Sequence, residues 1–177
     1  VKALGGYRFS TGWAKNQKIF FWAEFSRPSV EFSVAENPNN DSERGRVRKP
    51  IYGYYNLGKV EEGTQVLVKV ALSPVSVEGA KANMAAELPG WDFEATKAAA
   101  RQAWNDELSK VDATFSDSDT RTVFYTAMYH TMVAPSVFDD VDGQYRGSDD
   151  VVRKGNFRNY TTFSLWDTYR AQMPLMT

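Results

Sequence analysis

The sequence predicts an α+β protein in which strands come first and helices follow. In the N-terminal part, apolar residues recur at every second position, which is typical of strands. The clearest such run is Val66, Val68, Val70 and Leu72. At Ser73-Pro74 the apolar period changes from two to about 3.6 residues, the helical period. We therefore expect antiparallel strands in residues 1–73, helices in residues 92–177 and a helical connector between them.

Several strands are expected in the N-terminal part. Ile19 to Phe25 and Val30 to Val34 both alternate between the two faces of a strand, and Tyr52 to Leu57 is suited to a further short strand. Residues 36–49 carry turn-forming and charged side chains, so they are expected to form a solvated loop.

Three helices are expected between residues 75 and 135. Ser76 is suited to cap the first, and Pro89-Gly90 ends it. The second begins near Asp92. The third spans Ser118 to Ala134, where Pro135 ends it, and it is apolar nearly all round, which predicts burial between other helices. The residues expected to be buried on the first two helices are Val77, Ala80, Met84, Leu88, Phe93, Ala100, Trp104, Leu108 and Val111.

The helical period is lost after Gly143. Residues 151–157 are expected to form a hairpin whose turn is Lys154-Gly155. Ser164 is then suited to open a last helix.

Composition narrows the class of protein. The 177 residues include 21 basic and 22 acidic side chains, interspersed without a basic stripe, which argues against a nucleic-acid partner. Cysteine is absent, which excludes disulfides, thiolate metal sites and a cysteine nucleophile. The 14% aromatic share suits carbohydrate or peptide binding, and equally a large aromatic core. No apolar run approaches the roughly 20 residues that span a bilayer.

Both ends of the sequence look internal to a longer protein. The chain starts at Val1 rather than at a methionine and ends shortly after Pro174. A targeting signal upstream of Val1 would therefore not be visible in this sequence.

The run from Asn159 to Arg170 contains the candidate functional residues. Trp166, Asp167 and Arg170 stand at the expected first turn of the last helix. An indole face stacks on the apolar side of a sugar ring, while a carboxylate and a guanidinium fix hydroxyl groups by charge-assisted hydrogen bonds. This combination favours a protein that handles carbohydrate.

The same residues also allow structural roles. Ser164 to Asp167 fits a capping box, in which Asp167 would bond the main-chain amide of Ser164. Arg170 stands three residues beyond Asp167, close enough on a helix to pair with it and orient it.

An acidic loop precedes Gly143. Asp139, Asp140 and Asp142 have the alternation that suits a hard cation such as calcium, but no glutamate stands where a bidentate ligand belongs. A turn held by aspartate side chains is the favoured prediction. For Arg146, an ion pair that braces the loop is favoured over contact with a ligand.

The remaining chemically interesting residues are expected to be structural. His130 is the only histidine, so a metal site with two histidines cannot form, and a buried hydrogen-bonded histidine is favoured over a catalytic one. Trp22, Trp91 and Trp104 are candidates for the core. Trp13 is also one, but it follows Ser10-Thr11-Gly12 and has the best chance of the four of facing a ligand.

Four residue strings occur in an order that carries a resemblance. They are Pro89-Gly90-Trp91-Asp92-Phe93, residues 124–131, Asp140 to Gly147 and Tyr160 to Ala171. In residue identity and order they resemble glycoside hydrolase family 92, the calcium-dependent exo-acting α-mannosidases. The resemblance spans nearly all of residues 66–177, and the β-rich start is consistent with it.

The resemblance implies an architecture. The family has an N-terminal β-sandwich, a helical linker and a C-terminal (α/α)6 barrel. Residues 1–73 would be part of the sandwich, residues 74–112 the linker and residues 113–177 the start of the catalytic barrel. Such a segment would leave broad apolar faces uncovered, so it is expected to need the rest of the protein for stability.

The resemblance also implies an activity. The family's enzymes are inverting α-mannosidases that release terminal mannose from glycans in the periplasm or outside the cell. By this resemblance Trp166 and Asp167 belong to the pocket that binds the terminal sugar. Arg170 is counted among the substrate-binding residues, with orientation of Asp167 favoured slightly over direct contact with the sugar. The expected cofactor is calcium, whose ligands, like the catalytic acid and base, would lie mostly beyond Thr177. The expected specificity is of the α-1,2 type, although the residues that select a linkage lie outside the terminal-sugar pocket. The segment alone is expected to be inactive.

Two alternatives remain open at this point. One is a non-catalytic carbohydrate-binding protein of the same architecture, which keeps the pocket and lacks the catalytic carboxylates. The other is a glycosidase with the same layout of domains and another substrate, which the match of residue strings disfavours.

Overall fold

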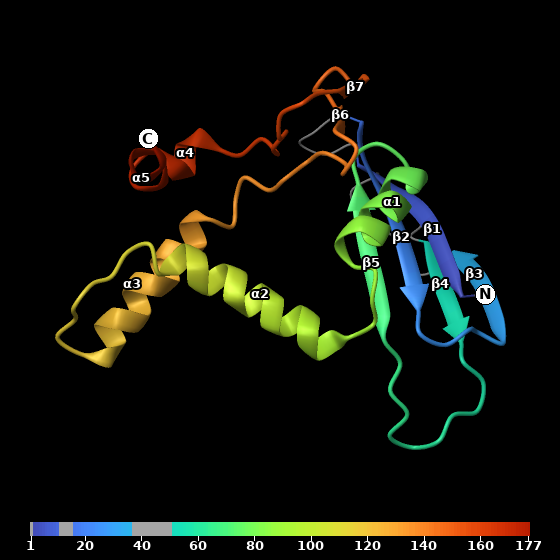
Figure 1. The fold of residues 1–177 in the computed structure, drawn as a ribbon. Helices are drawn as coiled ribbons and strands as arrows, with labels where there is room; N and C mark the ends of the chain where they lie inside the picture. The colour runs from blue at the N-terminus through green and yellow to red at the C-terminus, as the bar shows by residue number, and fades with distance from the viewer. Residues whose placement is uncertain (1, 11–15, 37–50) are drawn as a thin grey trace, which may run out of the picture.

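A computed structural model describes residues 2–10, 16–36 and 51–177 (Figure 1). Within these residues the chain is an α+β structure with three small antiparallel sheets and five helices. The elements in order are β1 (Ala3–Ser10), β2 (Gln17–Phe25), β3 (Glu31–Glu36), β4 (Ile51–Asn56), β5 (Val68–Ser73), α1 (Val77–Glu87), α2 (Phe93–Leu108), α3 (Ser118–Thr131), β6 (Gln144–Arg146), β7 (Val152–Lys154), α4 (Leu165–Thr168) and α5 (Gln172–Met176).

The largest sheet has the strand order β1-β2-β5, and helix α1 lies on one of its faces (Figure 1). Trp22 on β2 stands opposite Gly5 on β1 and Ala71 on β5. Because side chains alternate along a strand, Lys69, Ala71 and Ser73 share the face toward α1. The other face of β5 carries exposed apolar side chains, namely Val68, Val70 and Leu72. The predicted alternation of this strand is therefore confirmed, and α1 covers its more polar face.

Strand β1 was not predicted. Gly5 and Gly6 interrupt its alternation, so the sequence pattern carries little strand signal. The structure supplies a reason for Gly5: a Cβ at this position would lie 2.4 Å from Val77 Cγ1 on α1 and 2.9 Å from the Trp22 ring. The glycine lets the helix approach the sheet closely.

Strands β3 and β4 form a second sheet. They pair antiparallel, with Phe32 opposite Tyr55, as the alternation in these segments predicts. Tyr55 stacks on Phe25 of β2 with ring centroids 3.7 Å apart, which joins the two sheets. Residues 37–49 of the expected loop lie outside the described residues, and so does Trp13.

Helix α1 begins where the sequence predicts. The Ser76 hydroxyl accepts a hydrogen bond from the Gly79 amide (2.9 Å), and Ala80 and Met84 are buried. The other end is held by Lys69, a buried lysine on β5. Its ammonium donates to the Leu88 carbonyl (3.1 Å), pairs with Glu24 (3.4 Å) and lies over the Trp91 ring. A cation thus meets the carbonyl end of the helix, where the helix dipole favours it.

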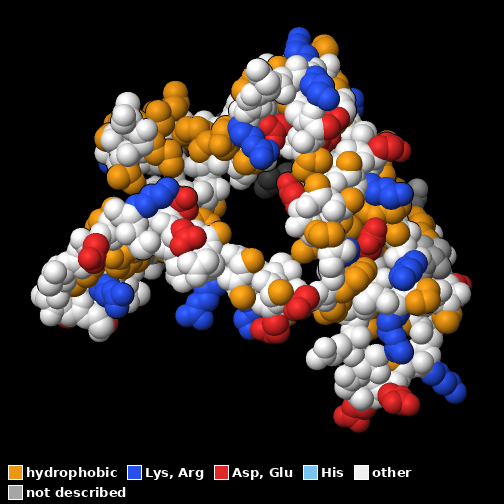
Figure 2. Space-filling model, in the orientation of Figure 1, with side chains coloured by type: hydrophobic (Ala, Val, Ile, Leu, Met, Phe, Trp, Pro, Cys, Tyr) orange, Lys and Arg blue, Asp and Glu red, His pale blue; other side chains and the backbone are white. Residues whose placement is uncertain are grey.

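The predicted burial of α2 and α3 is wrong for the described residues. Neither helix has a buried residue, and Phe93 and Val123 expose 61% and 68% of their surface. Trp104 packs on Tyr129 with ring centroids 4.6 Å apart but stays partly exposed, and His130 is also exposed. The two helices extend away from the sheet, and Figure 2 shows open space between them and the sheet. They have apolar faces because of their sequence, but little of the described chain packs on them.

Because the core is small, the solvent-accessible surface of the chain is large. The chain exposes 13710 Å², whereas a compact monomer of the same 20.0 kDa mass exposes roughly 8,700 Å². The buried apolar residues that the structure describes are Ala23, Ala80 and Met84. No helix in the described ranges is long and apolar enough to cross a bilayer.

Two element boundaries differ from the prediction. Helix α3 ends at Thr131, because Ala134 precedes Pro135 and a residue before proline is disfavoured in the helical conformation. The hairpin near residue 150 pairs β6 with β7, so Lys154-Gly155 is not its turn. The turn instead lies between Gly147, whose amide donates to the Val151 carbonyl (2.9 Å), and Asp150, which has a positive φ of 65°.

A buried carboxylate joins the loop before β6 to the sheet and α1. Asp140 is 3% exposed. Its Oδ2 accepts from the Ser73 hydroxyl (2.8 Å) and its Oδ1 from the Asn83 amide (2.8 Å). Asn83 also accepts from the Val141 amide (2.9 Å) and donates to the Leu72 carbonyl (2.9 Å). One strand, one helix and one distant loop therefore meet at a single side chain.

The directions of these bonds require an ionised carboxylate. The Ser73 hydroxyl already accepts from the amides of Val75 and Ser76, so its own proton goes to Asp140. The Asn83 carbonyl oxygen faces the Val141 amide, so its NH2 group faces Asp140. Burial raises the pKa of the Asp140 carboxyl, and the two hydrogen bonds lower it in part. Keeping this anion inside the protein is costly, and the two donors offset that cost.

Arg146 makes a second connection beside Asp140. Its guanidinium donates to the carbonyls of Pro74 (2.8 Å) and Val75 (3.0 Å), and it pairs with Asp150 (3.0 Å). The predicted loop-bracing ion pair is confirmed, and the same side chain also reaches the β5–α1 junction. We call Ser73, Asn83, Asp140 and Arg146 together the Asp140 clamp.

Lys69→Met in the intact protein is expected to lower the free energy of unfolding by about 1–3 kcal/mol, because the Leu88 carbonyl loses its buried donor. The matched control is Lys97→Met, which removes an exposed ion pair to Glu94 and should change stability by less than about 0.5 kcal/mol. Denaturant unfolding measures both. Equal effects of the two substitutions would contradict the anchoring role of Lys69.

Gly79→Ala is expected to destabilise the intact protein, although alanine is normally favoured over glycine in a helix by about 1 kcal/mol. The added Cβ would lie 2.2 Å from Asp140 Oδ2 and 2.7 Å from Ser73 Oγ, so the Asp140 clamp must open. Gly90→Ala is the control, because its Cβ would meet only the Asp92 amide nitrogen at 4.0 Å. A higher melting temperature for Gly79→Ala would show that the clamp tolerates the methyl group.

Candidate functional site

Helix α4 presents two of the candidate residues, Trp166 and Asp167, on one exposed turn. Trp166 is 86% exposed, and Asp167 is also exposed. Within the described residues Asp167 takes part in no hydrogen bond or ion pair. The capping box is not formed, because Ser164 makes no side-chain cap bond. The indole and the carboxylate are therefore both accessible to a ligand.

Arg170 does not form the expected pair with Asp167. Its Nε donates to the Tyr169 hydroxyl (2.6 Å), and its guanidinium lies 5.3 Å from the centre of the Tyr169 ring. The physical reason is the length of α4, which ends at Thr168. The i,i+3 geometry that would bring the two side chains together does not extend to Arg170.

The segments on both sides of α4 are tied to residues 131–139. Upstream, the Thr161 amide donates to the Ser136 carbonyl (2.8 Å), and Tyr160 forms a β-bridge with Val137. Downstream, the Gln172 side-chain amide donates to the carbonyls of Thr131 (2.8 Å) and Ala134. The position of α4 thus depends on where residues 131–139 lie.

The carboxylates of the acidic loop, Asp139, Asp140 and Asp142, bond to different partners and do not converge on one point. Asp139 accepts from the Asn159 amide (2.8 Å) and pairs with Arg158 (3.1 Å). Asp142 accepts from the amide and the side chain of Gln144, and these hydrogen bonds lower the pKa of its carboxyl. The prediction of a turn held by aspartate side chains is confirmed. In the part of the chain that the structure describes, no group of three or more candidate ligands is placed to hold a metal ion, so these residues do not fit a calcium site.

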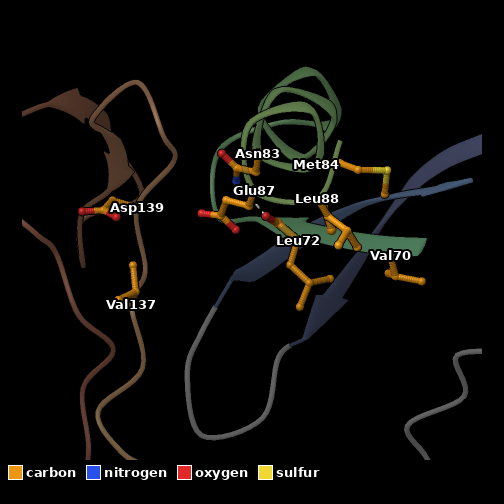
Figure 3. Close-up of a pocket in the computed structure, with 9 residues that line it drawn as sticks. Val70, Leu72, Asn83, Met84, Glu87, Leu88, Val137 and Asp139 are labelled. Atoms are coloured by element: carbon orange, nitrogen blue, oxygen red, sulfur yellow. Dashed lines mark hydrogen bonds between the residues drawn. The ribbon is translucent and has the colours of Figure 1, made fainter. Parts of the chain in front are cut away.

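A pocket of about 420 Å³ lies between β5, α1 and the acidic loop (Figure 3). Its polar side chains are Asn83, Glu87 and Asp139. The apolar lining residues are Val70, Ala71, Leu72, Met84, Leu88 and Val137. Trp166, Asp167 and Arg170 do not line it, so the structure does not bring the predicted site residues to this pocket.

Sequence reasoning missed the polar residues of this junction. Asn83 is a buried amide next to Met84 on the covered side of α1, and a polar residue at such a position is the one available signal. Asp139 belongs to a loop that was singled out, but its partners Arg158 and Asn159 stand 19 and 20 residues away. A local pattern cannot specify pairs at that separation.

Comparison with known proteins identifies relatives of the chain. The family model for the glycosyl hydrolase family 92 catalytic domain matches residues 79–177, which include Asp140, Trp166, Asp167 and Arg170. A curated relative is an uncharacterised secreted glycosidase of Arthroderma benhamiae. It is 30% identical over 114 residues, which is 62% of this chain and 14% of the relative.

Solved structures match almost the whole chain. A family GH92 α-mannosidase from Bacteroides thetaiotaomicron is 35% identical, covers 99% of this chain and superposes with a TM-score of 0.82. The same enzyme has been solved in complex with mannoimidazole. A family GH92 inverting mannosidase from that organism is 26% identical, covers 99% of this chain and has a TM-score of 0.76.

The chain spans 24% of the length of each of these two structures, so it corresponds to about a quarter of such a protein. The family model covers more than half of the chain, and the fold agrees with the solved members over nearly all of it. The chain belongs to glycosyl hydrolase family 92.

Proposed function

We propose that this chain is part of an inverting, exo-acting α-mannosidase in which Trp166, Asp167 and Arg170 bind the terminal mannose of a glycan. The observation that carries the proposal is the family match over residues 79–177, which includes all three residues. The accessibility of Trp166 and Asp167 on one turn also supports it.

Each residue has a distinct role in the proposal. The indole of Trp166 stacks on the apolar face of the pyranose. The carboxylate of Asp167 accepts hydrogen bonds from sugar hydroxyls, since it has no competing partner among the described residues. Arg170 donates to the sugar or to Asp167 after it leaves the Tyr169 hydroxyl. This set selects and orients a sugar and does not cleave a bond.

Hydrolysis with inversion needs two carboxyl groups roughly 6.5–9.5 Å apart on opposite sides of the scissile bond. We place this pair, and the ligands of a calcium ion, outside this segment. Calcium would supply positive charge at the sugar when bound. In the proposal the protein acts outside the cytoplasm. The secreted relative supports this location.

The proposal assigns residues 1–73 to a β-sandwich, residues 74–112 to a linker and residues 113–177 to the start of an (α/α)6 barrel. The Phe25–Tyr55 stack between two sheets supports the first assignment. The uncovered apolar faces of α2 and α3 support the others, because further helices would bury them.

Asp167→Ala in the intact protein is expected to lower kcat/KM for an α-mannoside by roughly 10- to 100-fold. That is the loss when one hydrogen bond to a charged group disappears. Asp119→Ala is the matched control, because Asp119 is also an exposed acid in the first turn of a helix; it should stay within about twofold. Steady-state release of mannose measures both. Equal turnover for Asp167→Ala and wild type would refute the assigned role.

The same assay separates an enzyme from a binding protein. We expect mannose release with calcium and none with a chelator. A protein that binds mannosides but releases no mannose under either condition would be a non-catalytic carbohydrate-binding member of the family.

A further inference from the structure

We propose that the Asp140 clamp positions the turn that carries Trp166 and Asp167, so that Asp140 controls turnover without touching the sugar. This inference rests on the proposed function of Trp166 and Asp167. Asp140 is thus a positioning residue, and the loop that contains it transmits its effect to α4.

The clamp is the place where the C-terminal segment meets the sheet. The hydrogen bonds that cross between them join Asp140, Val141 and Arg146 to Ser73, Pro74, Val75 and Asn83, with Asp140 accepting and Val141 and Arg146 donating. Lys18 on β2 adds an ion pair to Asp150 (3.1 Å). The Arg146 guanidinium also lies 5.9 Å from the centre of the Phe20 ring on β2. Along the chain, the exposed helices α2 and α3 connect the two parts.

The path from the clamp to α4 is short and hydrogen-bonded. Asp139, next to Asp140, holds the Asn159 amide, and the Phe138 amide donates to the Asn159 carbonyl (2.8 Å). The pairing then continues through Val137 with Tyr160 and Ser136 with Thr161. From Thr161 three residues lead into α4.

The far side of α4 returns to the same segment. Gln172 bonds the carbonyls of Thr131 and Ala134, so residues 162–171 form a loop with both ends fixed on residues 131–139. When residues 131–139 shift relative to the sheet, α4 shifts with them. Misplacing a substrate-binding group by about 1 Å can lower a rate by about 100-fold.

Replacing one carboxylate oxygen of Asp140 is expected to open the clamp. Both oxygens of Asp140 face donors whose directions are fixed by their other bonds. In Asp140→Asn, one of the two atoms becomes an NH2 group, which must face the Ser73 hydroxyl or the Asn83 amide. Asparagine has nearly the same shape as aspartate, so the substitution adds no bulk. It leaves one hydrogen-bond donor facing another, and this opens the clamp.

The first test measures amide hydrogen exchange in the intact protein. Asp140→Asn is expected to speed exchange of residues 136–139 and 159–161 at least tenfold and to leave β3 and β4 unchanged. Asp142→Asn is the matched control, because Asp142 bonds only within its own loop through Gln144. Unchanged exchange at residues 159–161 in Asp140→Asn would overturn the inference.

The second test is a double-mutant cycle on kcat/KM with an α-mannoside. Asp140→Asn alone is expected to lose roughly 10- to 100-fold. In the Asp167→Ala background the same change should lose clearly less than it does alone, because one of the two groups that the clamp positions is already gone. Losses that multiply independently would show a merely structural role and overturn the inference. Asp142→Asn should change kcat/KM by less than about twofold in either background.

Failure of the inference and failure of the proposed function give different results. If Asp167→Ala keeps full activity, the role of Asp167 in the proposed function is wrong, whatever Asp140→Asn does. If Asp167→Ala loses activity but Asp140→Asn does not, only the positioning role is wrong. Should Asp140→Asn fail to fold, Arg146→Lys takes its place in both tests. It keeps the charge beside Asp150, but one ammonium cannot reach the carbonyls of Pro74 and Val75 together with Asp150.

Discussion

The structure depends on an anion that is buried beside neutral donors. Asp140 has no cationic partner among the described residues, so the Ser73 hydroxyl and the Asn83 amide must compensate for its lost hydration. They do so because their own positions are fixed, Ser73 by two main-chain amides and Asn83 by the Leu72 carbonyl and the Val141 amide. The strand, the helix and the loop are therefore placed relative to one another by one group, and the burial of that group makes its geometry strict.

Local features of this fold could be predicted from the sequence. Ser76 and Asp92 cap α1 and α2 as expected, because a cap is an interaction with an amide three residues away. The alternation of β5 and the change of period after Ser73 also follow from neighbouring residues. Strand β1 was missed because Gly5 serves the close approach of Val77, which is a tertiary constraint. The partners of Asp140 were missed for the same reason, since no local pattern names Ser73 or Asn83.

Some features of the candidate site could likewise be predicted from the sequence, and others could not. Trp166 and Asp167 could be singled out by residue type and motif, because the chemistry of sugar binding lies in the side chains themselves. The expected pair of Asp167 with Arg170 does not form, and its absence could not be predicted, because it depends on whether α4 continues past Thr168. Periodicity alone could not predict the exposure of α2 and α3, since an apolar helix face indicates that something covers it and does not say what. Only the resemblance implied that this segment would leave apolar faces uncovered.

The long separations inside the clamp have a consequence for how the chain folds. Asp140 stands 57 residues from Asn83 and 67 from Ser73, and contacts across such loops form slowly because the chain entropy must be lost first. The hairpins and the capped helices can form early, from neighbouring residues. The turn that carries Trp166 and Asp167 would then reach its final place in one of the last steps, so a newly made chain would contain both side chains before it positions them.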